Sequence, residues 1–190
     1  SIQVIDSYSA SVGLGLLAIY AVDLKQEGKS YHEIISMINK KKLETNVYMV
    51  LDSLSYIVKG GRVPPKIKTI SDILRLRPVL GTKKGKLTAR GVLYGKSKMV
   101  DKFSKFINKR INPNKKYRMM VAHANSKVSG DKLSNLLINN NDNIDEKFVV
   151  ELGGALGCHS GPGALVVGLQ ELDIKEESWY KLLLISYWVI

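Results

Sequence analysis

Apolar and polar residues alternate along the chain in blocks of two different periods. Short apolar runs, typical of buried strands, are separated by longer stretches in which apolar residues recur every three or four positions, as in amphipathic helices. The predicted strands are Ile2–Ile5, Val47–Leu51, Leu76–Leu80, Leu87–Leu93, Tyr117–His123, Phe148–Leu152 and Ala164–Leu169. Strands that alternate with helices predict an α/β fold.

Local signals mark the ends of the predicted helices. Gly28 stands where a left-handed glycine ends a helix, after the apolar stretch Leu14–Leu24. Ser30 and Glu33 have the spacing of a capping box, so a second helix is predicted to begin there. The other predicted helices are Asp52–Lys59, Met99–Ile107 and Ser129–Ile138.

Glycine and proline divide this pattern into segments. Pro64-Pro65, after Gly60-Gly61, is the strongest linker signal. The segment before it holds too few elements to cover both faces of a sheet, so we expect an incomplete first lobe. The predicted organisation is residues 1–62 as the remainder of a first α/β lobe, 63–169 as a second α/β lobe with a ligand loop at 153–163, and 170–190 as an unassigned tail.

Composition narrows the class of protein. Of 190 residues, 45% are hydrophobic and 24% are charged, which is ordinary globular usage. The single Cys158 excludes an intramolecular disulfide and a cysteine-based zinc site. The chain opens without the pattern of a secretory signal, and Leu182–Ile190 is far shorter than the roughly 20 residues that span a bilayer. We therefore expect a cytoplasmic protein without stable membrane insertion.

Charge is the most unusual property of the sequence. The formal net charge is +12, which suits nucleic acid, an anionic membrane or an acidic protein partner. Lys98, Lys102, Lys105 and Lys109 recur at i, i+4, i+7 and i+11 and form a basic stripe opposite the apolar side of their helix. The stripe is either a solvated helix face or a docking surface, and it lacks the interleaved aromatics of a single-strand stacking platform.

Two segments of the first lobe suit the binding of an anion. Ser7 and Ser11 lie where a strand meets a helix, and free N–H groups and the dipole at a helix N-terminus attract negative charge. The same hydroxyls are also explained by N-terminal capping alone. Arg62 follows Gly60-Gly61, and its planar guanidinium suits a carboxylate or phosphate. A salt bridge between lobes explains this arginine equally well.

The glycine-rich loop holds the third candidate group. His159, Ser160 and Gly161 lie where backbone approaches closely, and an imidazole can donate a hydrogen bond to an anion near neutral pH. A structural hydrogen bond is the alternative. Cys158 and His159 suggest a thiol–imidazole pair only weakly, because neighbours in sequence rarely face each other. His32 and His123 fit no metal-ligand spacing, so no metal or other cofactor is predicted.

Four motifs occur in a fixed order along the chain. They are Val4–Ser7 with Ser11 and Gly13–Gly15; Asp52–Leu54 with Lys59–Arg62; Leu76–Leu80 with Lys84–Lys86; and His159–Ala164. In this order and spacing they resemble the DegV family of bacterial fatty-acid-binding proteins. The resemblance extends from Ser1 to about Leu169. It implies a two-lobe α/β fold with a three-layer first lobe and an acyl chain buried between the lobes.

The resemblance also implies a function. Family members bind a long-chain fatty acid without changing it, and some present it to a separate fatty acid kinase. Arg62 matches the arginine near the site between the lobes, and His159 matches the histidine near the carboxylate. The chain resembles an N-terminally truncated member, because no segment matches the family's upstream Ser/Thr motif. Its basic stretch after the hairpin is altered to Gly95-Lys96-Ser97-Lys98.

Three hypotheses for function follow. The first is a fatty-acid carrier that is not an enzyme, because the sequence offers hydroxyls, one arginine and one histidine but no nucleophile–base pair and no paired carboxylates. The second is a basic nucleic-acid-binding protein, which rests on the net charge and the lysine stripe. The third is a small hydrolase that uses Ser7 or Ser160, against which stands the absence of a G-x-S-x-G nucleophile elbow.

Overall fold

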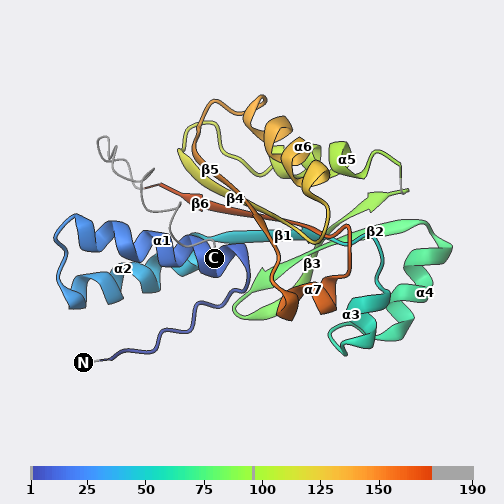
Figure 1. The fold of residues 1–190 in the computed structure, drawn as a ribbon, viewed down its shortest axis with the longest axis horizontal. Helices are drawn as coiled ribbons and strands as arrows, with labels where there is room; N and C mark the ends of the chain where they lie inside the picture. Colours follow the sequence, from blue (N-terminus) through green and yellow to red (C-terminus); the bar gives the residue numbers. More distant parts are fainter. Residues whose placement is uncertain (1, 96, 173–190) are drawn as a thin grey trace.

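The computed structural model describes residues 2–95 and 97–172 of the chain. In this part, six strands form one sheet in the order β3-β2-β1-β6-β4-β5 (Figure 1). The strands are β1 Asn46–Val50, β2 Leu76–Lys83, β3 Lys86–Tyr94, β4 Tyr117–His123, β5 Ile144–Glu151 and β6 Leu165–Glu171. Strands β4 and β5 are parallel, and the other neighbouring pairs are antiparallel.

Helices cover both faces of this sheet. They are α1 Val12–Gln26, α2 Tyr31–Glu44, α3 Ser55–Lys59, α4 Pro65–Ile73, α5 Met99–Asn108, α6 Lys127–Ile138 and α7 Gly154–Ser160. Helices α5 and α6 lie on one face, whereas α1 and the short helices α3 and α7 lie on the other (Figure 1). The predicted α/β class is confirmed.

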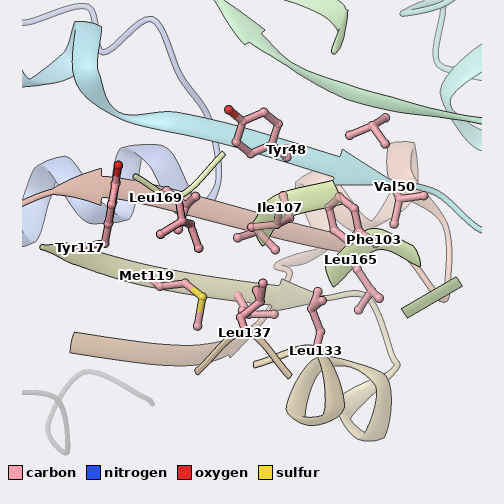
Figure 2. Close-up of a cluster of buried hydrophobic side chains, with 14 of the residues drawn as sticks. Tyr48, Val50, Phe103, Ile107, Tyr117, Met119, Leu133, Leu137, Leu165 and Leu169 are labelled. Atoms are coloured by element: carbon pink, nitrogen blue, oxygen red, sulfur yellow. The ribbon is translucent and has the colours of Figure 1, made fainter. Parts of the chain in front are cut away.

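The larger hydrophobic core lies between the sheet and the pair α5 and α6. Phe103 and Ile107 from α5 and Leu133 and Leu137 from α6 are fully buried there. Figure 2 shows them meeting side chains from β1, β4 and β6, including Met119. This packing follows from the apolar spacing of the two helices, and it turns the opposite side of α5 toward solvent.

A second apolar cluster fixes α1 on the other face. Val12 and Leu16 pack on Met120 and Val166 of the sheet. Gly168 in β6 lets the helix come close, because a Cβ there would lie 2.8 Å from a methyl carbon of Leu16. The N-terminus of α1 is thereby held against the sheet.

The predicted signals at the ends of α1 and α2 are confirmed. Gly28 has a φ of 76°. Its N–H donates to Lys25 O, and the N–H of Lys29 donates to Leu24 O, which is the Schellman pattern. The capping box is formed, since the Glu33 N–H donates to Ser30 Oγ and the Ser30 N–H donates to Glu33 Oε2.

Ser30→Ala is expected to lower the free energy of unfolding by about 1 kcal/mol, because it removes an N-cap acceptor. Urea denaturation followed by circular dichroism measures the change. Ser30→Asp is the matched control, since aspartate also caps helices well. Equal losses in both variants would contradict a capping role.

Two predicted local structures are wrong. Ile2–Ile5 is not a strand: among the described residues no strand pairs with it, and Ile2 and Val4 are 97% and 87% exposed. The sequence analysis did not predict α4, which Pro65 begins at a position where proline needs no N–H donor. The predicted loop at 153–163 contains α7, whose packing on α3 outweighs the low helix propensity of glycine.

The sheet continues across the predicted domain boundary at residue 62. Strand β1 precedes the boundary, and it pairs with β2 and β6, which both follow it. The described part of the chain therefore shares one sheet on both sides of this point. The division into two lobes, 1–62 and 63–169, stays a prediction, and residues 173–190 of the predicted tail lie outside the described residues.

A buried ionic cluster joins α1 to strands β4 and β5 of the sheet. Arg118 in β4 is fully buried and bonds Asp23 in α1 at 2.6 Å and Glu146 in β5 at 2.6 Å. Burial alone would lower the pKa of Arg118, but the hydrogen bonds and charges of Glu146 and Asp23 outweigh burial and raise this pKa. The guanidinium therefore stays charged and fixes the position of α1 on the sheet.

Candidate ligand-binding cavity

A half-open cavity of about 490 Å³ lies on the face of the sheet that carries α1, α3 and α7. Its walls come from the start of α1, the β2–β3 hairpin, strands β1 and β6, and helix α7. Most of its lining is apolar, with Val47, Met49, Leu87, Leu152 and Val166 among the contributors. This volume is within the range of small-molecule sites, about 300–1,000 Å³.

Polar residues line the cavity from four segments: the N-cap of α1, the turn after α3, the end of α7 and strand β2. Four of the six predicted ligand-binding residues line it: Ser11, Arg62, His159 and Ser160. They come from the N-cap of α1, the turn after α3 and the end of α7. Thr82 of β2 is a further polar lining residue, which the sequence analysis missed because a threonine in a strand carries no distinctive signal.

The other two predicted residues have local structural partners. Ser7 Oγ donates to Ser9 O at 3.0 Å and accepts from the Ser9 N–H. Gly161, with a φ of 72°, lies against the ring of Tyr56, and a side chain there would collide with that ring. Neither residue is among those that line the cavity.

Two glycines join α3 to α7 and thereby place His159. The imidazole of His159 lies where a side chain at position 60 would project, so only glycine at 60 leaves room for it. Gly161 leaves similar room for Tyr56 in α3. The glycine turn before Arg62 and the segment that carries His159 are therefore one packed unit.

Ser11 occupies the N-cap of α1 in an unusual backbone conformation. Its φ is 54°, its side chain makes no capping hydrogen bond, and it lines the cavity at the start of a 15-residue helix. The preceding loop is tied to the hairpin, since the Gly85 N–H donates to Tyr8 O at 3.2 Å. The hydroxyl of Ser11 and the helix dipole can thus favour an anion at this end of the cavity.

Arg62 has an exposed side chain that bonds the turn it follows. Its Nη1 donates to Gly60 O at 3.0 Å. Within residues 2–95 and 97–172, no carboxylate is seen to pair with it, which leaves its other donors available to the cavity. The alternative of a salt bridge between lobes has no partner in the described part of the chain.

The two serines proposed for hydrolysis bond main-chain oxygens. Ser7 Oγ donates to Ser9 O, and Ser160 Oγ donates to Gly157 O at 3.4 Å. Cys158 Sγ donates to Ala155 O and is exposed. The described residues contain no group of three or more His, Cys, Asp or Glu that could hold a metal ion.

The basic stripe is mostly exposed. Lys98, Lys105 and Lys109 are exposed, whereas Lys102 is half-buried and donates to Tyr94 O at 2.5 Å. The one acidic residue between them, Asp101, bonds Lys132 of α6, and this hydrogen bond lowers the pKa of Asp101. Among the described residues, no ion pair is formed by the three exposed lysines, although the charge of Lys98 also helps to lower the pKa of Asp101.

The described residues include no helix with the length and apolar character that a membrane span requires.

Residues 1–172 match the model of a family described as "Uncharacterised protein, DegV family". The chain belongs to the DegV family. A DegV domain-containing protein of Clostridium perfringens is 30% identical over 174 residues, which cover 87% of this chain and 57% of the relative. The chain thus spans little more than half the length of the curated DegV relatives it matches.

Solved structures confirm the DegV fold. One of a DegV family protein from Thermus thermophilus, described as fatty acid binding, matches with a TM-score of 0.79 and 24% identity, over 90% of this chain and 61% of its own. Another from Eubacterium eligens, loaded with heptadecanoic acid, matches with a TM-score of 0.76 and 20% identity, over 90% and 61%. The predicted family is therefore correct.

Proposed function

We propose that this protein binds a long-chain fatty acid in the cavity, with the carboxylate at the polar end and the acyl chain on the apolar wall. One cavity holds both an apolar lining and the set Ser11, Arg62, His159 and Ser160, and this combination carries the proposal. Each buried CH₂ stabilises a complex by about 0.8 kcal/mol. The polar set offsets the cost of removing a carboxylate from water.

Similarity to ligand-bound relatives supports this assignment. The DegV protein from Eubacterium eligens holds heptadecanoic acid, and a DegV protein from Streptococcus agalactiae is described as fatty acid binding. We further propose that the protein holds the fatty acid unchanged, as a carrier and not an enzyme. A cytoplasmic location stays a prediction.

The test is mass spectrometry of an organic extract of the purified protein, followed by titration with hexadecanoic acid and its methyl ester. The acid is expected to co-purify or bind, and the ester to bind at least tenfold more weakly, since charge-assisted hydrogen bonds contribute about 1.5–3 kcal/mol each. Equal binding of acid and ester would contradict a carboxylate site. A salt-sensitive gel shift with random DNA and no lipid binding would favour the nucleic-acid alternative.

The basic stripe is proposed as the surface that meets a fatty acid kinase. Lys105→Glu with Lys109→Glu is expected to weaken this association while leaving fatty-acid binding unchanged, because exposed charges steer encounter without contacting the cavity. Surface plasmon resonance at two salt concentrations measures the association, which should weaken as salt rises. The matched control reverses Lys25 and Lys147, which are exposed elsewhere. Equal losses in both pairs would exclude the stripe as a specific surface.

A further inference from the structure

The segment from Leu152 to Ala164 forms a large part of the cavity wall. It contributes Leu152, Ala155, Leu156, His159 and Ser160. The segment leaves β5 and returns through β6, and β4 lies between these two strands in the sheet. It must therefore pass over the end of β4 (Figure 1).

The end of β4 bonds both ends of this segment. The Leu152 N–H donates to His123 O at 2.9 Å. On the return side, the Gly163 N–H donates to Ala124 O at 2.8 Å, and the Ala124 N–H donates to Ala164 O at 3.0 Å. Two consecutive residues at the strand end thus set where α7 starts and where it ends.

The His123 side chain fixes the turn that makes these bonds. It is 6% exposed, and its Nδ1 accepts the Ser126 N–H at 3.4 Å. Its ring packs on Gly130 of α6, where a Cβ would lie 2.8 Å from His123 Cδ2. The imidazole is therefore held between the turn and the helix, and His123 is not among the residues that line the cavity.

We propose that His123 is a positioning residue for the candidate site: it locks the turn at 123–126, which holds α7 and so fixes His159 in the cavity. The inference rests on the proposed function for the role of the cavity, and the placement of α7 can be measured without any ligand. The side chain acts through main-chain groups of residues 123 and 124 and does not touch the ligand.

Three variants distinguish the role of the His123 Nδ1 hydrogen-bond acceptor from the role of the His123 ring as a packed group. His123→Asn keeps an acceptor, because Asn Oδ1 and His Nδ1 are both three bonds from Cα. His123→Phe keeps a ring and removes the acceptor. Gly130→Ala presses on the ring while His123 is unchanged, and alanine suits the α6 backbone better than glycine does. Gly130→Ala is therefore expected to fold and to displace the His123 imidazole. This variant keeps the proposal testable if His123→Phe does not fold.

Amide hydrogen exchange at Leu152 and Gly163 is the ligand-free measurement, with Val121 and Val167 in the sheet as references. His123→Phe and Gly130→Ala are expected to speed exchange at the two test amides by about 2- to 10-fold, as for the loss of one hydrogen bond, with His123→Asn near the wild-type rate. The NMR signals of the His159 ring should shift in the first two variants and return in His123→Asn. Affinity for hexadecanoic acid should follow the same order.

Unchanged exchange at Leu152 and Gly163 in His123→Phe and Gly130→Ala would overturn the proposal. Equal acceleration at Val121 and Val167 would also overturn it, because the effect would then be global loss of stability. If the wild-type chain binds no fatty acid, the proposed function fails, and the exchange and ring-signal measurements still decide the role of His123.

Discussion

Arg118→Met is expected to lower the free energy of unfolding by about 3–5 kcal/mol, the usual effect of removing one partner from a buried ion pair. The guanidinium of Arg118 lies between Asp23 and Glu146, with N–O distances of 2.6 Å to each. Methionine fills similar space but leaves two carboxylates facing each other beside the sheet. The measurement is chemical denaturation of both proteins at neutral pH.

A neighbouring ion pair provides the control for Arg118→Met. Lys116 precedes β4 and bonds Asp145 of β5 at 2.9 Å, with both side chains substantially exposed. Lys116→Met should therefore change the free energy of unfolding by no more than about 1 kcal/mol. Similar losses in both variants would show that burial does not set the strength of the Arg118 cluster.

Local chemistry explains why much of the fold could be predicted from the sequence. Ser30 with Glu33 and Gly28 act through their own neighbours, so their pattern marks helix ends in any context. The turn between β2 and β3 is local in the same way, since Lys84 and Gly85 both have positive φ values and join two strands that pair directly. Strand β4 agrees at both ends with the predicted Tyr117–His123, since all seven residues are buried and apolar character dominates.

The errors arose where distant contacts decide local structure. Ile2–Ile5 has the apolar character of a strand, but a strand also needs a neighbour to bond its backbone. Residues 154–160 are rich in glycine, yet α7 forms because it packs on α3, which lies far away in the sequence. Such contacts leave no signal in the segment itself.

The candidate site shows the same limit. Ser11, Arg62 and His159 could each be singled out by residue type, but only the fold brings them to one cavity. Leu87 and Thr82 also line it, and nothing about a leucine or threonine in a strand distinguishes it in the sequence. The need for glycine at position 60 comes from His159, so it could not be deduced from the turn alone.

His159→Ala is expected to weaken fatty-acid binding by about 10- to 150-fold, because a charge-assisted hydrogen bond contributes roughly 1.5–3 kcal/mol. Titration with a fluorescent fatty acid measures the affinity, and circular dichroism verifies that the variant folds. Unchanged affinity in a folded His159→Ala protein would remove His159 from the site. Arg62→Ala should follow with a smaller loss, since Arg62 is exposed and already bonds Gly60 O.

Gly60→Ala tests the proposed contact between His159 and the carboxylate without changing the imidazole itself. Gly60 has a φ of −73°, which alanine adopts freely, so the backbone at this position tolerates the substitution. The added methyl group instead occupies the place of the His159 ring and must displace it. Binding is therefore expected to fall about tenfold or more, toward the level of His159→Ala, while the melting temperature changes little.

Gly61→Ala is the matched control, because the two glycines have opposite requirements. Gly61 has a φ of 69°, and nothing lies within 4 Å of an added Cβ. Alanine there should lower stability by about 1–2 kcal/mol through backbone strain, while His159 stays in place and affinity is kept. In the double variant Gly60→Ala with His159→Ala, the two losses of affinity should not add, since both substitutions remove the same contact between His159 and the ligand. Additive losses would mean that Gly60 acts on the site by a route other than the imidazole.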